Sequence, residues 1–151
     1  MVATALVTYL HFAGIIVLFA SLIIEAVLFK RHIAIPSARI IGRADAYFGI
    51  ASVVILATGL LKMFLYGKGT MYYTHNVLLW SKLGLFTVVG LMSIYPTVYF
   101  IRWRKKLSDN DGILVPEKEY RLISRLIWLE LSIAASIPLL AVFMARGFGT
   151  F

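Results

Sequence analysis

The 151-residue chain contains no cysteine, so it has neither a disulfide framework nor a thiolate metal site. Acidic residues are scarce: seven Asp and Glu stand against fifteen Lys and Arg, for a net charge of +8. Polar residues are too few to coat a water-soluble globule, because 61% of the chain is hydrophobic and the mean hydropathy is +0.89. The composition therefore predicts an integral membrane protein.

Long apolar runs occupy most of the sequence. A hydrocarbon core of about 30 Å needs about 20 apolar residues of helix. Four such stretches predict helices at 4–29, 44–66, 77–101 and 122–145. The first connection is short and holds Pro36 and Ser37, which favour a turn. We therefore expect an all-α fold, an antiparallel four-helix membrane bundle that forms one transmembrane domain over residues 1–151.

The basic residues follow the connections rather than a nucleic-acid-binding stripe. They flank the first and third connections: Lys30, Arg31, Arg39 and Arg43, then Arg102, Arg104, Lys105, Lys106, Lys118, Arg121 and Arg125. By the positive-inside rule both connections face the cytoplasm and both termini face the outer side. The pattern predicts a multi-pass protein of the bacterial inner membrane, with lipids as partners and no nucleic acid.

Several ionisable residues lie at membrane depth, where such groups usually face the bundle interior. The outer half is predicted to hold His11, Lys62, Lys82 and Arg146, and the inner half Glu25, Arg43, Asp45 and Glu130. Lys62 and Arg146 lie near helix ends and are expected to reach the headgroups. We expect Glu25, Arg43 and Asp45 to form ion pairs. Glu130 is expected either to pair with Arg43 or Arg125 or to handle protons.

His11 and Lys82 are predicted to lie at similar depth on the first and third helices. His75 precedes Lys82 by seven residues and lies on the same helical face, nearer the solvent. A buried imidazole can be a structural hydrogen-bonding group, a proton carrier or an axial ligand to haem iron. A copper site is disfavoured because the methionines do not cluster and no second intramembrane histidine is present.

Small residues mark faces where helices can approach closely. Gly49, Ser52 and Gly59 form such a stripe on the second predicted helix and are expected to be a packing seam. Gly84 and Gly90 on the third predicted helix favour self-association into a homo-oligomer.

Short sequence runs carry a resemblance to a known family. Tyr9-Leu10-His11, Ala57-Thr58-Gly59-Leu60, Leu79-Trp80-Ser81-Lys82-Leu83 and a glutamate early in the last helix resemble the HemJ-type protoporphyrinogen oxidases and the copper-resistance CopD proteins. The whole chain also resembles an uncharacterised bacterial family of predicted four-helix membrane proteins. The HemJ resemblance implies haem b, with His11 and Lys82 at the required positions and Glu130 as a looser match.

The sequence is compatible with three functions. The first is a small redox protein with haem b between the first and third helices. His11 would be the metal ligand, Lys82 and His75 would help to bind the cofactor, and Lys82 and Glu130 would be the catalytic groups. A porphyrin or quinone-like molecule is the expected small-molecule partner. The second is a non-haem binding or transport module for an anion, a lipid or protons. The third is a structural or assembly protein whose polar residues fix helix register.

Overall fold

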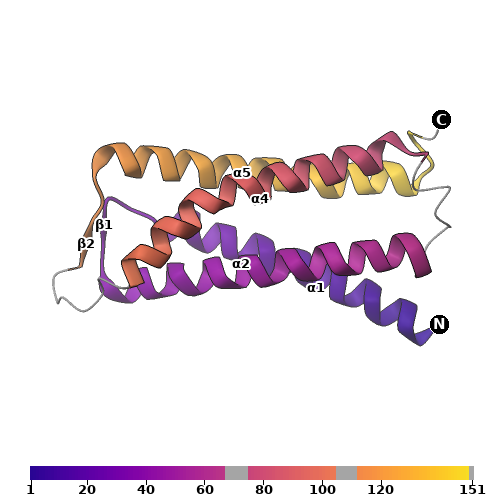
Figure 1. Ribbon diagram of the computed structural model, residues 1–151, viewed down its shortest axis with the longest axis horizontal. Coiled ribbons are helices and arrows are strands. Elements are labelled where there is room, and N and C mark those ends of the chain that lie inside the picture. The colour runs from indigo at the N-terminus through magenta and orange to yellow at the C-terminus, as the bar shows by residue number, and fades with distance from the viewer. Residues whose placement is uncertain (67–74, 105–111, 150–151) are drawn as a thin grey trace.

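The computed structural model describes residues 1–66, 75–104 and 112–149 (Figure 1). Four long helices make up most of this part of the chain: α1 (Val2–Leu28), α2 (Ile35–Leu61), α4 (Val77–Arg104) and α5 (Glu117–Ala145). A short π-helix, η1 (Lys62–Tyr66), directly continues α2. All four long helices are long and apolar enough to cross a membrane. The predicted all-α membrane bundle is therefore confirmed. Lys105 and Lys106, two of the basic residues predicted to flank the third connection, lie outside the described residues.

Two helix starts differ from the prediction. α2 begins at Ile35 rather than near residue 44, because Pro36 occupies the first turn of the helix, where its missing N–H has no helical partner to lose. α5 begins at Glu117 rather than at 122, directly after Pro116, and Glu117 and Glu119 lie in its first turn. Acidic side chains there favour the helix through its dipole. Both prolines thus start helices, and the turn predicted at Pro36 is wrong.

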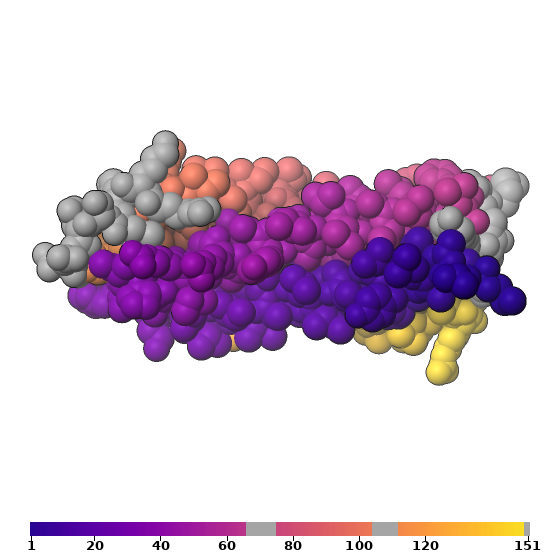
Figure 2. Space-filling view, turned by 90° about the horizontal axis from the view of Figure 1, so that it is seen from below, coloured from indigo at the N-terminus to yellow at the C-terminus, as the bar shows by residue number. Residues whose placement is uncertain are grey.

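The bundle consists of two helical hairpins packed side by side. α1 packs most extensively against α2 and α4 against α5, while smaller contacts join α1 to α5 and α2 to α4. Both chain ends lie at one end of the bundle (Figure 1), which we call the termini end; the opposite end is the sheet end. Figure 2 shows that α1 and α2 cover most of one face along the length of the molecule.

Buried apolar side chains form two cores. The central core joins all four helices through Leu18, Leu22, Phe48, Ala51, Val89 and Ala134. The sheet-end core is Phe29, Ile33, Ala38, Ile41, Phe100, Trp103, Val115, Ile123 and Ile127. Within the second, the ring of Phe29 stacks on Trp103 and on Tyr120, with 5.8 Å between ring centroids in each pair. The four helices are therefore held together from the centre to the sheet end.

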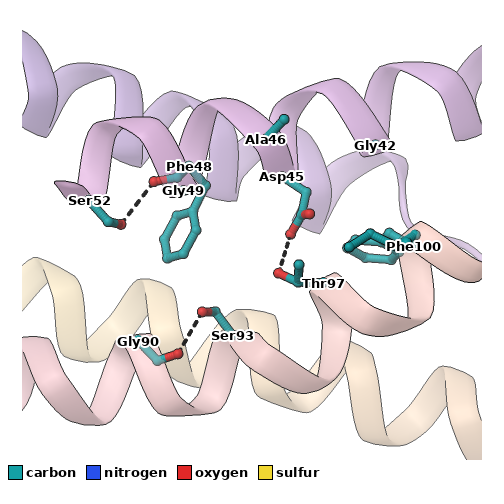
Figure 3. A pocket seen from close by; sticks show the side chains of 11 residues that line it. Gly42, Asp45, Ala46, Phe48, Gly49, Ser52, Gly90, Ser93, Thr97 and Phe100 are labelled. Carbon is teal, nitrogen blue, oxygen red and sulfur yellow. Dashed lines mark hydrogen bonds between the residues drawn. The ribbon is translucent and has the colours of Figure 1, made fainter. Parts of the chain in front are cut away.

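A groove of about 420 Å³ opens between α2 and α4 (Figure 3). Gly49 and Ser52 line this groove, and a Cβ atom added at Gly49 would meet nothing within 4 Å. The predicted packing seam is therefore wrong at these two positions. Gly59 does contact α1, since a Cβ atom there would lie 3.5 Å from His11 Cε1. Gly90 lines the same groove, and Gly84 also has open space beside it.

A two-stranded antiparallel ladder closes the sheet end. β1 (His32–Ile33) pairs with β2 (Ile113–Leu114) and so joins the first connection to the third. Gly112 precedes β2 with φ +74°, and a Cβ atom there would lie only 3.0 Å from the carbonyl oxygen of Ile33. A residue other than glycine would be strained at this position.

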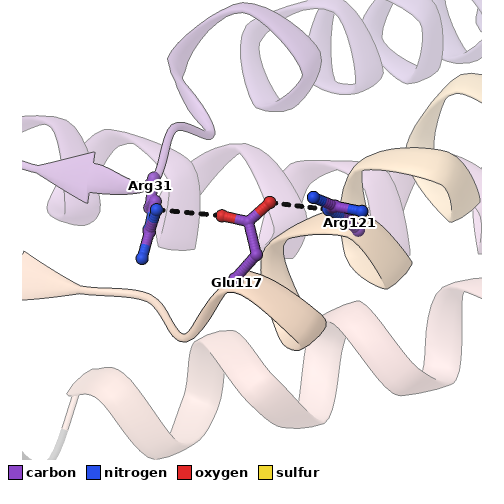
Figure 4. A network of polar contacts seen from close by, with 3 residues as sticks. All are labelled: Arg31, Glu117 and Arg121. Atoms are coloured by element: carbon purple, nitrogen blue, oxygen red, sulfur yellow. Dashed lines mark hydrogen bonds and ion pairs between the residues drawn. The ribbon is translucent and has the colours of Figure 1, made fainter.

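An ion-pair network lies beside the ladder. The carboxylate of Glu117 accepts from Arg31 at 3.0 Å and from Arg121 at 2.6 Å (Figure 4). These side chains are substantially exposed, so the pairs add little stability. They do link the start of β1 to the start of α5.

Candidate functional site: a basic cluster in the bundle

Three basic side chains from three segments lie close together near the termini end. His11 comes from α1, Lys62 from η1 and Lys82 from α4, and all three are half-buried. His11 interacts electrostatically with both lysines, and the two lysines interact with each other. We call these residues the basic cluster. The predicted proximity of His11 and Lys82 is consistent with this geometry.

A threonine on α2 orients the His11 ring. Thr58 is buried and its hydroxyl donates to the carbonyl oxygen of Val54 at 2.6 Å. The Thr58 oxygen therefore acts as acceptor for His11, whose Nδ1 lies 2.9 Å away. Because the Thr58 oxygen accepts, the neutral His11 ring is assigned the tautomer with its proton on Nδ1. The lone pair of Nε2 takes no part in this hydrogen bond. The sequence contained this threonine within the run Ala57-Thr58-Gly59-Leu60, but gave no reason to assign it this role.

The π-helix brings in the third basic group. Lys62 is the first residue of η1, and its Nζ lies 5.8 Å from the centroid of the Phe12 ring on α1. That is within the range of a cation–π contact. Lys62 thus belongs to the basic cluster, although its place near a helix end had suggested only an interfacial lysine. π-helical turns are rare and frequently occur at functional sites.

No described acidic residue lies in the half of the bundle that holds the basic cluster. Along the helices, all of them fall in the half nearer the sheet end: Glu25, Asp45, Glu117, Glu119 and Glu130. The basic cluster therefore has no carboxylate from the described residues to balance its charge. A concentration of positive charge at membrane depth is costly unless a partner neutralises it.

Three acidic residues in the half of the bundle nearer the sheet end form a separate group. Glu25, Asp45 and Glu130 come from α1, α2 and α5 and interact electrostatically with one another. The ion pair predicted for Glu25 is wrong, and of the two alternatives for Glu130 the structure does not show the ion pair with Arg43 or Arg125. Arg43 and Arg125 are exposed, and the ion pairs seen among the described residues involve neither Glu25 nor Glu130.

The structure does not bring the two predicted catalytic residues together. Lys82 lies five residues, or about 8 Å, inside α4 from the termini end, whereas Glu130 lies 15 residues, or about 22 Å, from the same end of α5. They are separated by ten residues, or about 15 Å, in depth. Joint chemistry by Lys82 and Glu130 at one small substrate is therefore disfavoured.

The structure also shows where His75 lies and whether the described residues could bind a metal ion. His75 is exposed in the turn before α4, nearer the termini end than Lys82. Among the described residues, no group of three or more His, Asp or Glu side chains could hold a metal ion. His11 would therefore need a ligand that brings its own donor atoms, as a porphyrin does.

A comparison with known protein families places this chain. The protein-family model described as "Predicted membrane protein (DUF2214)" matches residues 3–149, which is nearly the whole chain. No curated protein and no solved structure matches the chain.

Proposed function

We propose that this chain, which belongs to the DUF2214 family of predicted membrane proteins, binds an amphipathic anion within the membrane. The observation that supports the proposal is the basic cluster of His11, Lys62 and Lys82, which lies in a half of the bundle where the described residues include no acid. An anionic group of a ligand would neutralise this charge. The apolar remainder of the ligand would lie against the hydrocarbon-facing helices.

The orientation of the protein decides which leaflet holds this site. Arg146 lies at the termini end, whereas the sheet end has most of the described basic residues outside the basic cluster: Lys30, Arg31, Arg39, Arg43, Arg102, Lys118, Arg121 and Arg125. We place the sheet end on the cytoplasmic side of the bacterial inner membrane by the positive-inside rule. The basic cluster then lies in the outer half, and the ligand reaches it from the outer leaflet or the outer solution.

Protoporphyrin IX is a suitable first probe, because it carries two carboxylates on a large apolar ring. Its dimethyl ester has the same ring without the negative charges. We expect the purified protein in maltoside detergent to bind the acid about 100-fold more tightly than the ester, a difference of about 2.7 kcal/mol. Quenching of tryptophan fluorescence measures both affinities. Equal affinities would refute anion recognition by the basic cluster.

Haem b is a second candidate, and the orientation of His11 favours it. A ligating histidine usually donates its other ring N–H to a fixed acceptor, as Nδ1 of His11 does to Thr58. The Nε2 atom could then bind haem iron, while Lys62 and Lys82 could pair with the propionates. Bound haem b would supply one-electron chemistry.

The haem candidate has a spectroscopic test. Protein purified after expression with ample haem should show a Soret band that sharpens on reduction with dithionite. His11→Leu should lose this band, whereas His32→Leu, at an exposed position of β1, should keep it. A colourless wild-type protein that still prefers the free acid porphyrin would eliminate haem and leave anion binding intact.

A further inference from the structure

The three carboxyl groups of the inner half form a buried cluster contributed by separate helices. Glu25 on α1 is 3% exposed, Glu130 on α5 is 1% exposed and Asp45 on α2 is 9% exposed. Each interacts electrostatically with the other two. The fourth helix supplies Thr97, whose hydroxyl donates to Asp45 Oδ1 at 2.6 Å. We call Glu25, Asp45 and Glu130 the carboxyl cluster.

Two members of the carboxyl cluster have side-chain oxygens without a hydrogen-bond partner. These are Oε1 of Glu25 and Oε1 of Glu130, and both atoms are buried. Neither residue forms an ion pair within the part of the chain that the structure describes. The basic side chains near this depth on the helices packed around the cluster are exposed: Arg39, Arg43, Arg102 and Arg125.

Full ionisation of this cluster is physically unfavourable. Three negative charges would then lie together in a low-dielectric interior, and buried carboxylates that face one another cannot all ionise at neutral pH. Retained protons remove the like-charge repulsion. Burial of all three groups and the unpartnered oxygens of Glu25 and Glu130 therefore favour bound protons over three separate charges.

The groove between α2 and α4 leads to this cluster from the surface of the bundle. Asp45 and Thr97 both line it, and Figure 3 shows their side chains meeting across it. The hydroxyls of Ser52 and Ser93 also lie along the groove (Figure 3), each donating to a backbone carbonyl of its own helix. Their oxygens remain able to accept hydrogen bonds from water. The groove thus provides polar groups on the way to Asp45.

We propose that Glu25, Asp45 and Glu130 form a proton-binding site that exchanges protons with the surroundings through the α2–α4 groove. Asp45 is the member that meets the groove, and Glu25 and Glu130 store the protons deeper in the bundle. This site is separate from the basic cluster, so the proposal of proton binding does not depend on anion binding.

Infrared spectroscopy of the purified protein tests the site. In maltoside detergent, which has no carbonyl group, wild-type protein at neutral pH should show the carbonyl band of protonated carboxylic acids, with a downshift in D₂O. Glu25→Gln and Glu130→Gln should each lose part of this band. Glu117→Gln is the matched control and should keep it, because Glu117 is held as a carboxylate by Arg31 and Arg121. Absence of the band from the wild type, or an unchanged band in both cluster variants, would overturn the proposal.

A second pair of variants tests the route. Gly49→Leu would occupy the groove, where a Cβ atom meets nothing within 4 Å, and should slow the D₂O shift without removing the band. Gly84→Leu adds the same side chain at another open position of the bundle and should leave the rate unchanged. Equal rates in the two variants would rule out the groove as the route.

Discussion

Replacing both Lys62 and Lys82 by glutamine should weaken binding of protoporphyrin IX about 100-fold, or about 2.7 kcal/mol. Removing one partner of a buried charge pair costs about 2–5 kcal/mol at protein interfaces. Both lysines are half-buried, so we expect a smaller loss of about tenfold for each. Fluorescence titration of the single and double variants measures these losses.

The same variant gives a sharper comparison with the neutral ligand. The dimethyl ester has no charge to lose, so the double variant should bind acid and ester with similar affinities. Arg146→Gln is a matched control, because Arg146 is an exposed basic residue at the same end of the bundle, and its affinity should change by less than about threefold. A double variant that still prefers the acid would exclude these lysines as its binding groups.

Truncating Phe29 to alanine should lower the free energy of unfolding by about 3 kcal/mol. Phe29 is 3% exposed and contacts Phe100, Trp103 and Tyr120, so its removal leaves a cavity in the sheet-end core. The loss is chiefly of packing contacts, because a bilayer gives little hydrophobic driving force between helices. Unfolding by increasing fractions of dodecyl sulfate in mixed micelles measures the change.

An exposed phenylalanine provides the control for this experiment. Phe64 on η1 is 59% exposed, and Phe64→Ala should change the free energy of unfolding by less than about 0.5 kcal/mol. If Phe29→Ala and Phe64→Ala were equally stable, the aromatic packing at the sheet end would not hold the two hairpins together.

Hydropathy was sufficient to predict the four helices and their antiparallel order, because each apolar run is long enough to cross a bilayer. The helix starts were less accurate, since Pro36 and Pro116 were compatible with either a turn or the first turn of a helix. The two-residue ladder of β1 and β2 was not predictable. Its pairing joins segments about 80 residues apart and depends on how the hairpins pack.

The candidate site was only partly visible in the sequence. His11 and Lys82 were found because ionisable residues are unusual at their depth. Lys62 was missed as a member of the cluster because its neighbours depend on the π-helix that begins there. The absence of acidic residues from the sequence segments near the termini end was a signal that could have identified it.

The acidic residues in the half nearer the sheet end show why residue types did not specify interaction partners. Glu25, Asp45 and Glu130 were recognised as polar groups at membrane depth, and nearby arginines made ion pairs plausible. Which side chains meet depends on the rotation of each helix about its axis. In the structure the three acids turn inward, while Arg43 and Arg125 are exposed.

The affinity of the wild-type protein for protoporphyrin IX, compared with that for its dimethyl ester, tests anion binding most directly. The two ligands share one apolar ring and differ in the charges that the basic cluster is proposed to neutralise. We predict about 100-fold tighter binding of the acid, and loss of this preference in the double lysine variant. Equal affinity of the wild type for both ligands would contradict the proposed function.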